Sequence, residues 1–368
     1  MTGVGIEFRG VSKRYGGATS PLVVKGIDFQ VPKGSLLTIL GPSGCGKTTT
    51  LRMIAGLESP SSGQILIDGV DVTTLGPAER NVSMVFQSYA LFPHMSVIEN
   101  VGYGLSVSGV SAAETAQRAR VALETVGLVG FDARSPSELS GGQQQRVAVA
   151  RSLVLEPSVL LFDEPLSNLD ARLRRSMREE IRALQQRLKL TVAYVTHDQS
   201  EALAVSDQII VMDAGCIAQC GTPQQLYEQP GSEFVAGFMG EALLFDAQVQ
   251  ASGEVQVGPL RLPPPAGGPR PVPGAVKLAV RPEAWHIAPG AEAPGGEGDH
   301  AGSLPGRLLK QAYLGHSQEL TVATDLGEIF VVSPQARQRW EIGQPVWLRL
   351  SAERTSIVPL PARRTGQP

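Results

Sequence analysis

A glycine-rich segment with the composition of a phosphate-binding loop follows an apolar run near the start of the chain. It reads GPSGCGKT over residues 41–48 and fits the pattern G-x-x-x-x-G-K-[ST]. Its glycines let backbone N–H groups turn toward phosphate oxygens, while Lys47 places an ammonium on the β- and γ-phosphates and Thr48 offers a hydroxyl to Mg²⁺. The alternative, a glycine turn with a chance lysine, is disfavoured by LLTIL before the loop and the helical pattern TTTLRMIAGL after it. We expect the phosphates of a nucleotide to be bound by Gly41, Pro42, Ser43, Gly44, Cys45, Gly46, Lys47, Thr48 and Thr49.

A pair of carboxylates ends the apolar segment VLLFDE at 159–164. Asp163 is placed to hold Mg²⁺ through a water, and Glu164 is placed to polarise an attacking water. Many α/β proteins carry acids at strand ends, so the pair is a weak signal alone. Downstream of a phosphate loop, it predicts a site of phosphate-chain hydrolysis.

The segments that position these residues predict a parallel α/β sheet. Short, near-continuously apolar runs are typical of strands covered on both faces, and they alternate with helical patterns. The clearest helix places Leu173, Met177, Ile181, Leu184 and Leu188 on one apolar stripe. The predicted strands span 36–40, 82–86, 159–162, 191–196 and 208–212.

The composition changes near residue 240. Beyond it, Gly- and Pro-rich stretches at 262–274 and 293–306 separate short alternating segments, and no long helical period remains. We expect an α/β domain over 1–240 and a small all-β domain with flexible loops over 241–368. A disordered tail is the alternative, which the β-branched segments and the tryptophans disfavour. The tryptophans that suit a small core are Trp285, Trp340 and Trp347.

Length and composition exclude several classes of protein. The chain has 368 residues, enough for two domains, and 35 acidic against 32 basic side chains, so no strong field draws it to nucleic acid or anionic lipid. Three cysteines cannot form a disulfide framework, which fits a reducing compartment. The N-terminus predicts no signal peptide, and the apolar runs are far shorter than a membrane span of about 20 residues. Any membrane role is therefore expected to be peripheral.

The sequence LSGGQ at 139–143, followed by QQRVAVARSL, resembles the signature peptide of the nucleotide-binding domains of ABC transporters. Together with the phosphate loop and the segment FDEP at 162–165, this peptide shows that residues 4 to 240 resemble that family. The resemblance implies the P-loop NTPase fold. A serine and glycines at a helix start form a second anion site, here made of Ser140, Gly141, Gly142 and Gln143. In the family this surface covers ATP held by another copy, so the resemblance implies a homodimer with ATP between its subunits.

The resemblance assigns roles to further residues. Tyr15 in VSKRYGG matches the aromatic residue that stacks on adenine, with a strand-edge tyrosine as the alternative. Gln87 in MVFQSYALFPH matches the glutamine that senses Mg²⁺ and the γ-phosphate. Asn168 and Asp170 in SNLDARLR match the loop that crosses the dimer seam, with Asp170 among the ATP contacts. His197 in YVTHDQSEA matches the switch histidine at the γ-phosphate.

The implied enzyme is an ATPase with ATP and Mg²⁺ as its ligands. Its catalytic residues are Glu164, His197 and Gln87, and its metal residues are Thr48, Gln87 and Asp163. The chemical positions all follow the family pattern, so we expect an active enzyme rather than a degenerate regulatory copy. The remaining histidines are expected to be surface or loop residues: His94, His286, His300 and His316.

An aromatic and proline cluster in residues 88–105 resembles the groove that receives a helix of a membrane permease. Tyr89, Leu91, Phe92 and Pro93 are the candidate contacts, and a core segment between two helices is the alternative. The implied partners are transmembrane permease subunits and, indirectly, an extracytoplasmic solute-binding protein. The implied location is the cytoplasmic face of the inner membrane, where the chain is held peripherally.

Two segments of the second domain, AVRPEAWHI at 279–287 and AYLGHSQELTVAT at 312–324, resemble the oligomer-binding-fold (TOBE) repeat of importer ATPases. The resemblance implies a regulatory or dimerisation domain. Small barrels also bind oligonucleotides, but 241–368 carries twelve basic and twelve acidic residues and few aromatic ones. We therefore expect no nucleic acid partner.

The permease and the binding protein select the solute, so this chain gives only a hint of it. The sequence pattern of the segment QSYALFPHMSV favours a polyamine such as spermidine or putrescine as the solute. Ferric iron, phosphonate and sugar are the alternatives. A different class, a non-transport ABC ATPase of DNA repair or translation, usually carries two cassettes or a long coiled coil. Neither is visible in this sequence.

Cys45 lies inside the phosphate loop, where a helix N-terminus lowers the pKa of some thiols. Two interpretations stay open: a reactive thiol whose modification blocks ATP binding, or a small loop filler. Cys216 and Cys220 flank a predicted turn, and their spacing without nearby histidines is poor for zinc, so we interpret them as structural.

Overall fold

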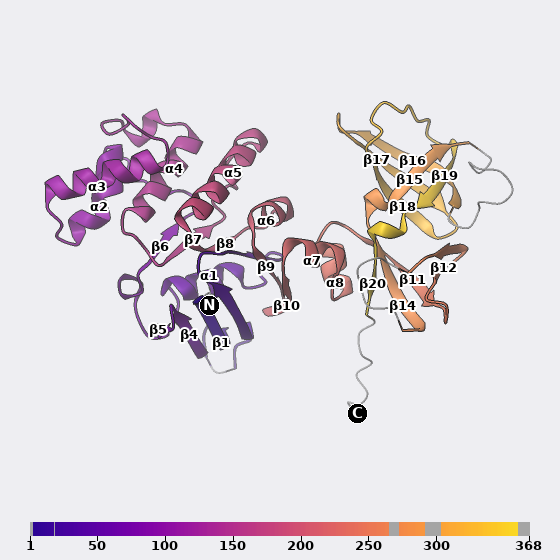
Figure 1. The fold of residues 1–368 in the computed structure, drawn as a ribbon, viewed down its shortest axis with the longest axis horizontal. Coiled ribbons are helices and arrows are strands. Elements are labelled where there is room, and N and C mark those ends of the chain that lie inside the picture. Colours follow the sequence, from indigo (N-terminus) through magenta and orange to yellow (C-terminus); the bar gives the residue numbers. More distant parts are fainter. Residues whose placement is uncertain (1–2, 18, 265–271, 291–302, 360–368) are drawn as a thin grey trace. The chain divides into compact units, whose positions relative to one another are not determined.

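The computed structural model describes residues 3–17, 19–264, 272–290 and 303–359. Contacts divide the chain into two compact units, Met1–Pro223 and Gln224–Pro368 (Figure 1). The sequence predicts a boundary after residue 240 instead. The residues between the two positions form the short helices α7 (Pro223–Glu228) and α8 (Glu233–Phe238). Much of the two Gly- and Pro-rich stretches lies outside the described residues.

A six-stranded sheet with the order β10-β9-β3-β8-β7-β6 forms the centre of the first unit. Its strands run parallel except for the edge strand β10, which is antiparallel to β9. The five parallel strands coincide with the five predicted from apolar runs, which confirms the α/β class. The strands are β3 (Leu36–Leu40), β6 (Val82–Val85), β7 (Val159–Asp163), β8 (Thr191–Val195), β9 (Gln208–Asp213) and β10 (Cys216–Gly221).

Both faces of this sheet are covered, which explains why its strands are apolar throughout. On one face, Leu37 and Leu161 pack with helix α1 (Lys47–Ala55) and with a second sheet. On the other face, their neighbours Leu36 and Leu160 pack with two helices. These helices are α4 (Gly141–Leu153) and α5 (Ala171–Leu188).

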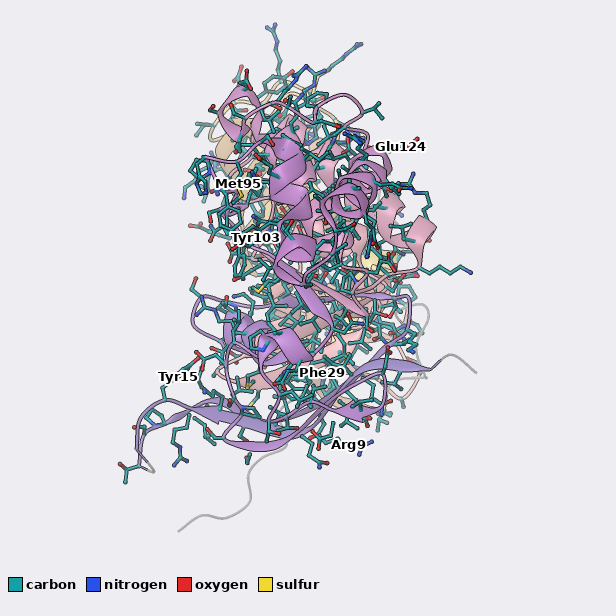
Figure 2. The ribbon with its side chains drawn as sticks, turned by 90° about the vertical axis from the view of Figure 1, so that its left-hand side faces the viewer. Arg9, Tyr15, Phe29, Met95, Tyr103 and Glu124 are labelled. Carbon is teal, nitrogen blue, oxygen red and sulfur yellow. The ribbon has the colours of Figure 1, made fainter. Side chains whose placement is uncertain are left out.

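The second sheet of this unit is antiparallel, with the order β2-β1-β4-β5. Phe8 and Phe29 stack inside it with ring centroids 4.4 Å apart, and Figure 2 shows Phe29 pointing toward the rest of the unit and Arg9 pointing away. These strands are not predicted from the sequence. Register shifts along β1 and β2 break the alternation of buried and exposed residues, so the period is weak. The strands are β1 (Val4–Arg14), β2 (Leu22–Pro32), β4 (Ser62–Ile67) and β5 (Val70–Asp71).

Three helices form a group with its own apolar core, in which Val101, Leu123 and Val147 are buried (Figure 1). They are α2 (Val97–Val107), α3 (Ala112–Thr125) and α4. The other short elements are α6 (Gln199–Val205) and 3-10 turns at Pro77–Glu79, Pro136–Glu138, Pro282–Ala284 and Ala352–Arg354. Within the described ranges, no helix is both long enough and apolar enough to cross a membrane.

Helix α5 is the predicted surface helix, but its apolar stripe ends one turn early. Leu188 is exposed, and Gln185 is buried nearby. The Nε2 atom of Gln185 donates hydrogen bonds to the carbonyl oxygens of Gly34 at 2.7 Å and of Leu190 at 3.0 Å. The buried amide is therefore satisfied by the main chain, which a count of apolar residues cannot anticipate.

The second unit contains two five-stranded antiparallel sheets, with the orders β13-β12-β11-β14-β20 and β15-β19-β16-β17-β18. They share one apolar core, which confirms the small all-β domain. Trp285 and Trp340 are buried in this core, whereas Trp347 is half-buried outside it, so the expectation for Trp347 is wrong. The strands are β11 (Leu243–Val249), β12 (Val255–Val257), β13 (Leu260–Leu262), β14 (Gly274–Val280), β15 (Trp285–Pro289), β16 (Ser303–Tyr313), β17 (Gln318–Thr324), β18 (Gly327–Ser333), β19 (Pro345–Leu350) and β20 (Thr355–Val358).

A buried arginine fixes α7 and α8 to this β-rich unit. The Arg281 guanidinium, directly after β14, donates to the carbonyl oxygen of Ala236 at 2.9 Å and also to those of Met239 and Tyr227. It lies 4.1 Å from the centroid of the Tyr227 ring. Burial, with a hydrogen bond to Glu283, raises the pKa of the Tyr227 hydroxyl to about 12. These contacts explain why the two helices group with the second unit.

Candidate nucleotide-binding site

The glycine-rich loop connects the end of β3 to the start of α1. At Gly41 a side chain has no room, because a Cβ would lie 2.3 Å from the carbonyl oxygen of Met212 and 2.6 Å from the Sγ atom of Cys45. Gly46 caps α1 with a φ of 106°, which favours glycine. The tight loop leaves the first N–H groups of α1 without partners inside the helix, as an anion site requires. Around it, Pro42, Thr48 and Thr49 are half-buried, and Ser43 and Gly44 are exposed.

Lys47 directs its ammonium into this loop. The side chain is buried, and Nζ donates to the carbonyl oxygens of Gly41 at 2.8 Å and of Pro42 at 2.9 Å. The loop therefore holds a positive charge at its centre. Since phosphate oxygens are stronger acceptors than carbonyls for an ammonium, this charge is ready to bind a phosphate chain.

Asp163 and Thr48 come together at the end of β7 and the start of α1. Burial raises the pKa of the Asp163 carboxyl above its usual range, and the negative charge of Glu164 raises it further. The positive charge of Arg52 acts in the opposite direction and lowers this pKa. A hydrogen bond from the Thr48 side chain acts in the lowering direction. The structure thus brings together two of the three residues predicted to hold a metal.

Glu164 and His197 also meet at the ends of neighbouring strands. The Oε2 atom of Glu164 lies 3.1 Å from Nδ1 of His197. The Glu164 N–H donates to the carbonyl oxygen of Val195, at the end of β8, at 3.0 Å. Glu164 has a φ of 46°, an uncommon conformation outside glycine that is frequent at functional sites. The carboxylate and the imidazole therefore approach one point, where they can share a proton.

Gln87 lies in the segment after β6 and is exposed. Its carbonyl oxygen accepts a hydrogen bond from the Nδ2 atom of Asn168 at 3.0 Å. This contact joins the segment after β6 to the segment between β7 and α5. Gln87, the third residue predicted to hold a metal, is thus tied by its main chain to the loop that begins at Glu164.

The signature residues form the capped start of α4. Ser140 Oγ accepts from the Gln143 N–H at 3.4 Å, and the Ser140 N–H donates to Gln143 Oε1 at 2.9 Å. Asp170 caps α5 in the same manner, since its Oδ1 atom accepts from the Leu173 N–H at 2.9 Å. The hydrogen bonds of Ser140 thus remain within its own helix turn, and the side chain of Ser140 is exposed to another molecule, whereas Gly141 is half-buried and Gly142 is buried.

Tyr15 follows β1 directly and is 45% exposed, so its ring is open to a ligand (Figure 2). The Lys13 ammonium lies 4.8 Å from the ring centroid. Lys13 is itself paired with Glu58 at 2.9 Å. An exposed ring beside a lysine held in an ion pair suits stacking on a purine. A tyrosine at a strand edge with no role in binding would have the same geometry, so both interpretations of Tyr15 stay open.

The lining of the predicted permease groove includes Phe92, as expected, but not Tyr89, Leu91 or Pro93. Tyr89 is buried, so it belongs to the core and not to the surface. The large exposed side chains here are Phe86 and Tyr103, each 40% exposed, and Tyr103 lies against Phe92 with ring centroids 4.7 Å apart. These three residues, with Leu155, line a cavity of about 440 Å³. Phe86 and Tyr103 are not predicted as contacts, because the sequence does not show which side of the segment faces outward.

The structure also decides between the interpretations of the cysteines. Cys45 is only 3% exposed, and burial raises the pKa of its thiol. The interpretation of Cys45 as a thiol with a lowered pKa is wrong, and the loop-filler interpretation holds. Cys216 and Cys220 lie on β10 rather than on either side of a turn.

Three of the four other histidines, His94, His286 and His316, are exposed, as expected of surface residues. His300 lies outside the described residues. Only His197 among the described histidines contacts a carboxylate, which sets it apart from the others.

Comparison with known families gives two matches. The ABC transporter family matches residues 24–167, and the TOBE domain matches residues 278–358. The Fe(3+) ions import ATP-binding protein FbpC of Agrobacterium fabrum is 56% identical over 331 residues, which cover 89% of this chain and 90% of the relative. Proteins of the same name from Brucella abortus and Escherichia coli O157:H7 are 51% and 50% identical. Those alignments cover 96% and 94% of this chain and 97% and 95% of the relatives.

Solved structures resemble the chain as well. The ATP-binding cassette MJ0796, a dimer in a post-hydrolysis state with ADP and Pi, matches with a TM-score of 0.53 and 31% identity, covering 59% of this chain and 98% of that one. CbiO1 of Clostridium perfringens, part of an ABC transporter complex, matches with a TM-score of 0.57 and 28% identity, covering 62% and 92%.

The fold and the site define a P-loop ATPase of the ABC type, which binds and hydrolyses ATP and carries a C-terminal TOBE domain. The chain belongs to the family of ATP-binding proteins of ABC importers.

Proposed function

We propose that this chain is the ATP-hydrolysing subunit of an importer for ferric ions. The relatives named for Fe(3+) import align with 89% to 96% of the chain. The observation that supports the enzymatic part is the contact of Glu164 with His197, at the strand ends that also carry Asp163. The solute assignment and the catalytic assignment therefore rest on separate observations.

The choice of ferric iron replaces the polyamine expectation. That expectation rests on one short segment, QSYALFPHMSV, whereas the named relatives extend over nearly the whole chain. Ferric iron is one of the alternatives that the sequence leaves open, and the relatives support it over a polyamine.

One half of the ATP site is formed by the loop and the residues around it. Lys47 binds the β- and γ-phosphates with its buried ammonium, and the N–H groups at the start of α1 bind the phosphate oxygens. Tyr15 stacks on the adenine ring with its exposed face. The loop residues from Gly41 to Thr49 surround the phosphate chain.

Thr48, Asp163 and Gln87 would hold Mg²⁺. The hydroxyl of Thr48 and the amide oxygen of Gln87 are oxygen ligands of the kind that Mg²⁺ prefers, and the Asp163 carboxylate would hold the ion through a water. The partly buried carboxyl of Asp163, with its raised pKa, gains the opposite charge it needs from a metal. When bound, Mg²⁺ neutralises charge on the β- and γ-phosphates.

Glu164 acts as the general base and His197 as the residue that orients it. Glu164 accepts a proton from the attacking water with its carboxylate, and His197, 3.1 Å away, fixes the position of that carboxylate and contacts the γ-phosphate. Gln87 links the γ-phosphate to the segment between β7 and α5, because its carbonyl oxygen accepts a hydrogen bond from Asn168.

The other half of the site comes from a second copy of the chain. The capped start of α4 is an anion site that the same chain's hydrogen bonds leave open, and it is formed by Ser140, Gly141, Gly142 and Gln143. Asp170 caps the neighbouring helix beside the seam. Two copies that face each other would close two ATP molecules between them, so hydrolysis needs the dimer.

The remaining partners follow from the importer assignment. Phe86, Phe92 and Tyr103 line the groove that would receive a helix of a transmembrane permease subunit. The permease in turn accepts its solute from an extracytoplasmic binding protein, and the chain is held peripherally at the cytoplasmic face of the inner membrane. The balance of charges in 241–368 argues against a nucleic acid partner.

Deletion of the gene in its native cells tests the proposal. Uptake of radiolabelled ferric iron is expected to fall to background and to recover with the wild-type gene but not with Lys47→Ala, while uptake of radiolabelled spermidine stays normal. Loss of spermidine uptake alone would restore the polyamine assignment. Normal uptake of both solutes would favour the non-transport class of ABC ATPase.

A further inference from the structure

The starts of α4 and α5 lie in direct contact within one chain. A Cβ at Gly142 would lie 2.9 Å from Leu173 Cδ1, and a Cβ at Gly141 would lie 3.3 Å from Leu169 Cδ2. The two signature glycines therefore pack against leucines on either side of Asp170, the residue that caps α5. Any change in the angle between α4 and α5 moves the Ser140 surface relative to the Asp170 surface.

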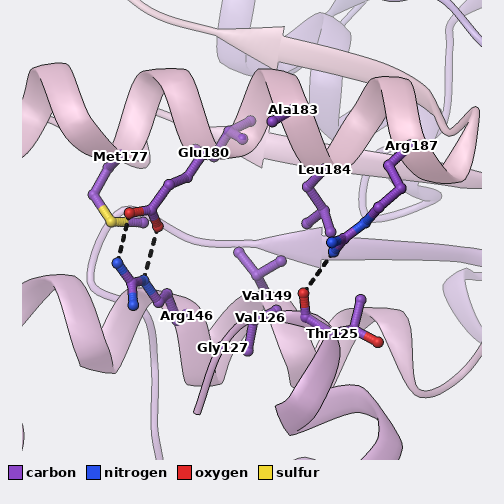
Figure 3. Close-up of a pocket in the computed structure, with 11 residues that line it drawn as sticks. Thr125, Val126, Gly127, Arg146, Val149, Met177, Glu180, Ala183, Leu184 and Arg187 are labelled. Carbon is purple, nitrogen blue, oxygen red and sulfur yellow. Dashed lines mark hydrogen bonds and ion pairs between the residues drawn. The ribbon is translucent and has the colours of Figure 1, made fainter.

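A forked ion pair joins the same two helices further along. Arg146 on α4 donates from Nε to Glu180 Oε2 at 2.8 Å and from Nη2 to Glu180 Oε1 at 2.5 Å (Figure 3). Ser176, one turn earlier on α5, donates to the same carboxylate at 3.4 Å. Two parallel hydrogen bonds fix both the distance and the orientation of the partners, which a single point contact does not.

Apolar packing between the two helices is incomplete next to the ion pair. A cavity of about 350 Å³ lies between the helices there, with Val149, Met177 and Leu184 in its lining. At the far side of the cavity, Arg187 Nη2 donates to the Thr125 carbonyl oxygen at 2.7 Å (Figure 3). A cavity removes van der Waals contacts that would otherwise fix the angle between the helices. The hydrogen bonds and the ion pair therefore contribute more to fixing this angle than they would in a fully packed interface.

We infer that Arg146 and Glu180 form a positioning pair for the ATP-bound dimer. The pair holds the capped start of α4 at a fixed angle to the capped start of α5, so Ser140 and Asp170 together present one preformed surface to the second copy. Preorganisation of this kind lowers the cost of association without a direct contact to ATP. The inference rests on the proposed function, in which two copies close around ATP.

The test uses full-length protein in a Glu164→Gln background, which is expected to hold ATP without hydrolysing it. Arg146→Gln and Glu180→Gln remove the pair in turn, and the double change Arg146→Glu with Glu180→Arg restores it with reversed charges. Arg175→Gln is the matched control, because Arg175 pairs with Glu179 at 3.3 Å on the exposed side of the same helix. The dimerisation constant with ATP is measured by sedimentation, and the affinity of the monomer for a fluorescent ATP analogue is measured by titration.

Each single change at Arg146 or Glu180 is expected to weaken ATP-driven dimerisation about ten-fold, which is about 1.4 kcal/mol. The affinity of the monomer for nucleotide should stay unchanged, and the reversed pair should recover most of the dimerisation. Dimerisation of Arg146→Gln equal to that of Arg175→Gln overturns the inference, as does a reversed pair that regains thermal stability without regaining dimerisation. A Glu164→Gln parent that stays monomeric with ATP contradicts the proposed function itself, so the two failures are distinguishable.

Discussion

The Nδ1 atom of His197 lies 3.1 Å from the Oε2 atom of Glu164. The two residues follow neighbouring parallel strands, and the main-chain bond from Glu164 to Val195 holds those strand ends together. The proposed base and its proposed orienting partner are therefore placed at the ends of neighbouring strands of the sheet.

Glu164→Gln is expected to lower kcat for ATP hydrolysis by a factor on the order of 10³, because an amide cannot accept the proton of the attacking water. The KM for ATP should change little, since Lys47 and the loop are intact. Steady-state ATPase assays measure both values. Glu179→Gln, the same change at an exposed position on α5, should leave both unchanged, and hydrolysis by Glu164→Gln at the wild-type rate would show that another group is the base.

Asp163→Asn is expected to raise the thermal midpoint of the nucleotide-free protein at pH 7 by about 2 °C. Burial raises the pKa of the Asp163 carboxyl in the folded protein above its ordinary value of about 3.9. Protonation of this carboxyl therefore stabilises the fold, and the stabilisation is fully present below the ordinary pKa. It is lost as the pH rises through the higher folded-state pKa. At neutral pH the carboxylate is charged and partly buried, and the amide removes that cost.

Melting curves over a pH series check this sign. The difference between Asp163→Asn and wild type should be largest near neutral pH and should shrink toward zero in acid. A variant less stable than wild type at pH 7 would mean that Arg52 and Thr48 compensate the charge fully. Glu179→Gln serves again as the control for an exposed carboxylate.

Cys45 is expected to react with a disulfide reagent at least 100-fold more slowly than Cys216, since Cys45 is buried and Cys216 is exposed. Burial raises the pKa of the Cys45 thiol, so its slow reaction should also need a higher pH than that of a free cysteine, whose pKa is about 8.5. Mass spectrometry of labelled peptides separates the two sites. Equal rates at pH 7 would contradict the loop-filler interpretation.

Arg281→Met is expected to destabilise the second unit by about 3 kcal/mol, because three carbonyl oxygens of α7 and α8 would lose their buried donor. The tryptophans of the chain, Trp285, Trp340 and Trp347, all lie in this unit, so their fluorescence during urea unfolding reports on it selectively. Arg349→Met, an exposed change on β19, is the control and should cost little. Equal unfolding midpoints for the two variants would show that Arg281 does not fix the helices.

The parallel sheet and the nucleotide loop could be predicted because each leaves a local mark in the sequence. Strands covered on both faces are apolar without interruption, and the loop needs glycine at positions such as Gly41, where backbone and sulfur leave no room for a side chain. The antiparallel strands β1 and β2 carry no such mark, since register shifts interrupt their period.

Contacts between distant segments could not be predicted in the same way. The burial of Tyr89 and the exposure of Phe86 depend on which side of one short segment packs inward, and both sides contain aromatic residues. The link between Arg146 and Glu180 joins residues 34 positions apart on different helices, so neither helical period nor charge spacing indicates it.

The central claim is that each ATP is cleaved between two copies of the chain, and mixing two inactive variants tests it most directly. Lys47→Ala has a defective loop and Ser140→Asp a defective signature, so each alone should show almost no ATPase activity. In a mixed dimer the intact loop of one copy faces the intact signature of the other, and an equal mixture should recover about a quarter of the wild-type rate under random pairing. A mixture as inactive as its parts, or a Ser140→Asp variant with full activity alone, would contradict the account.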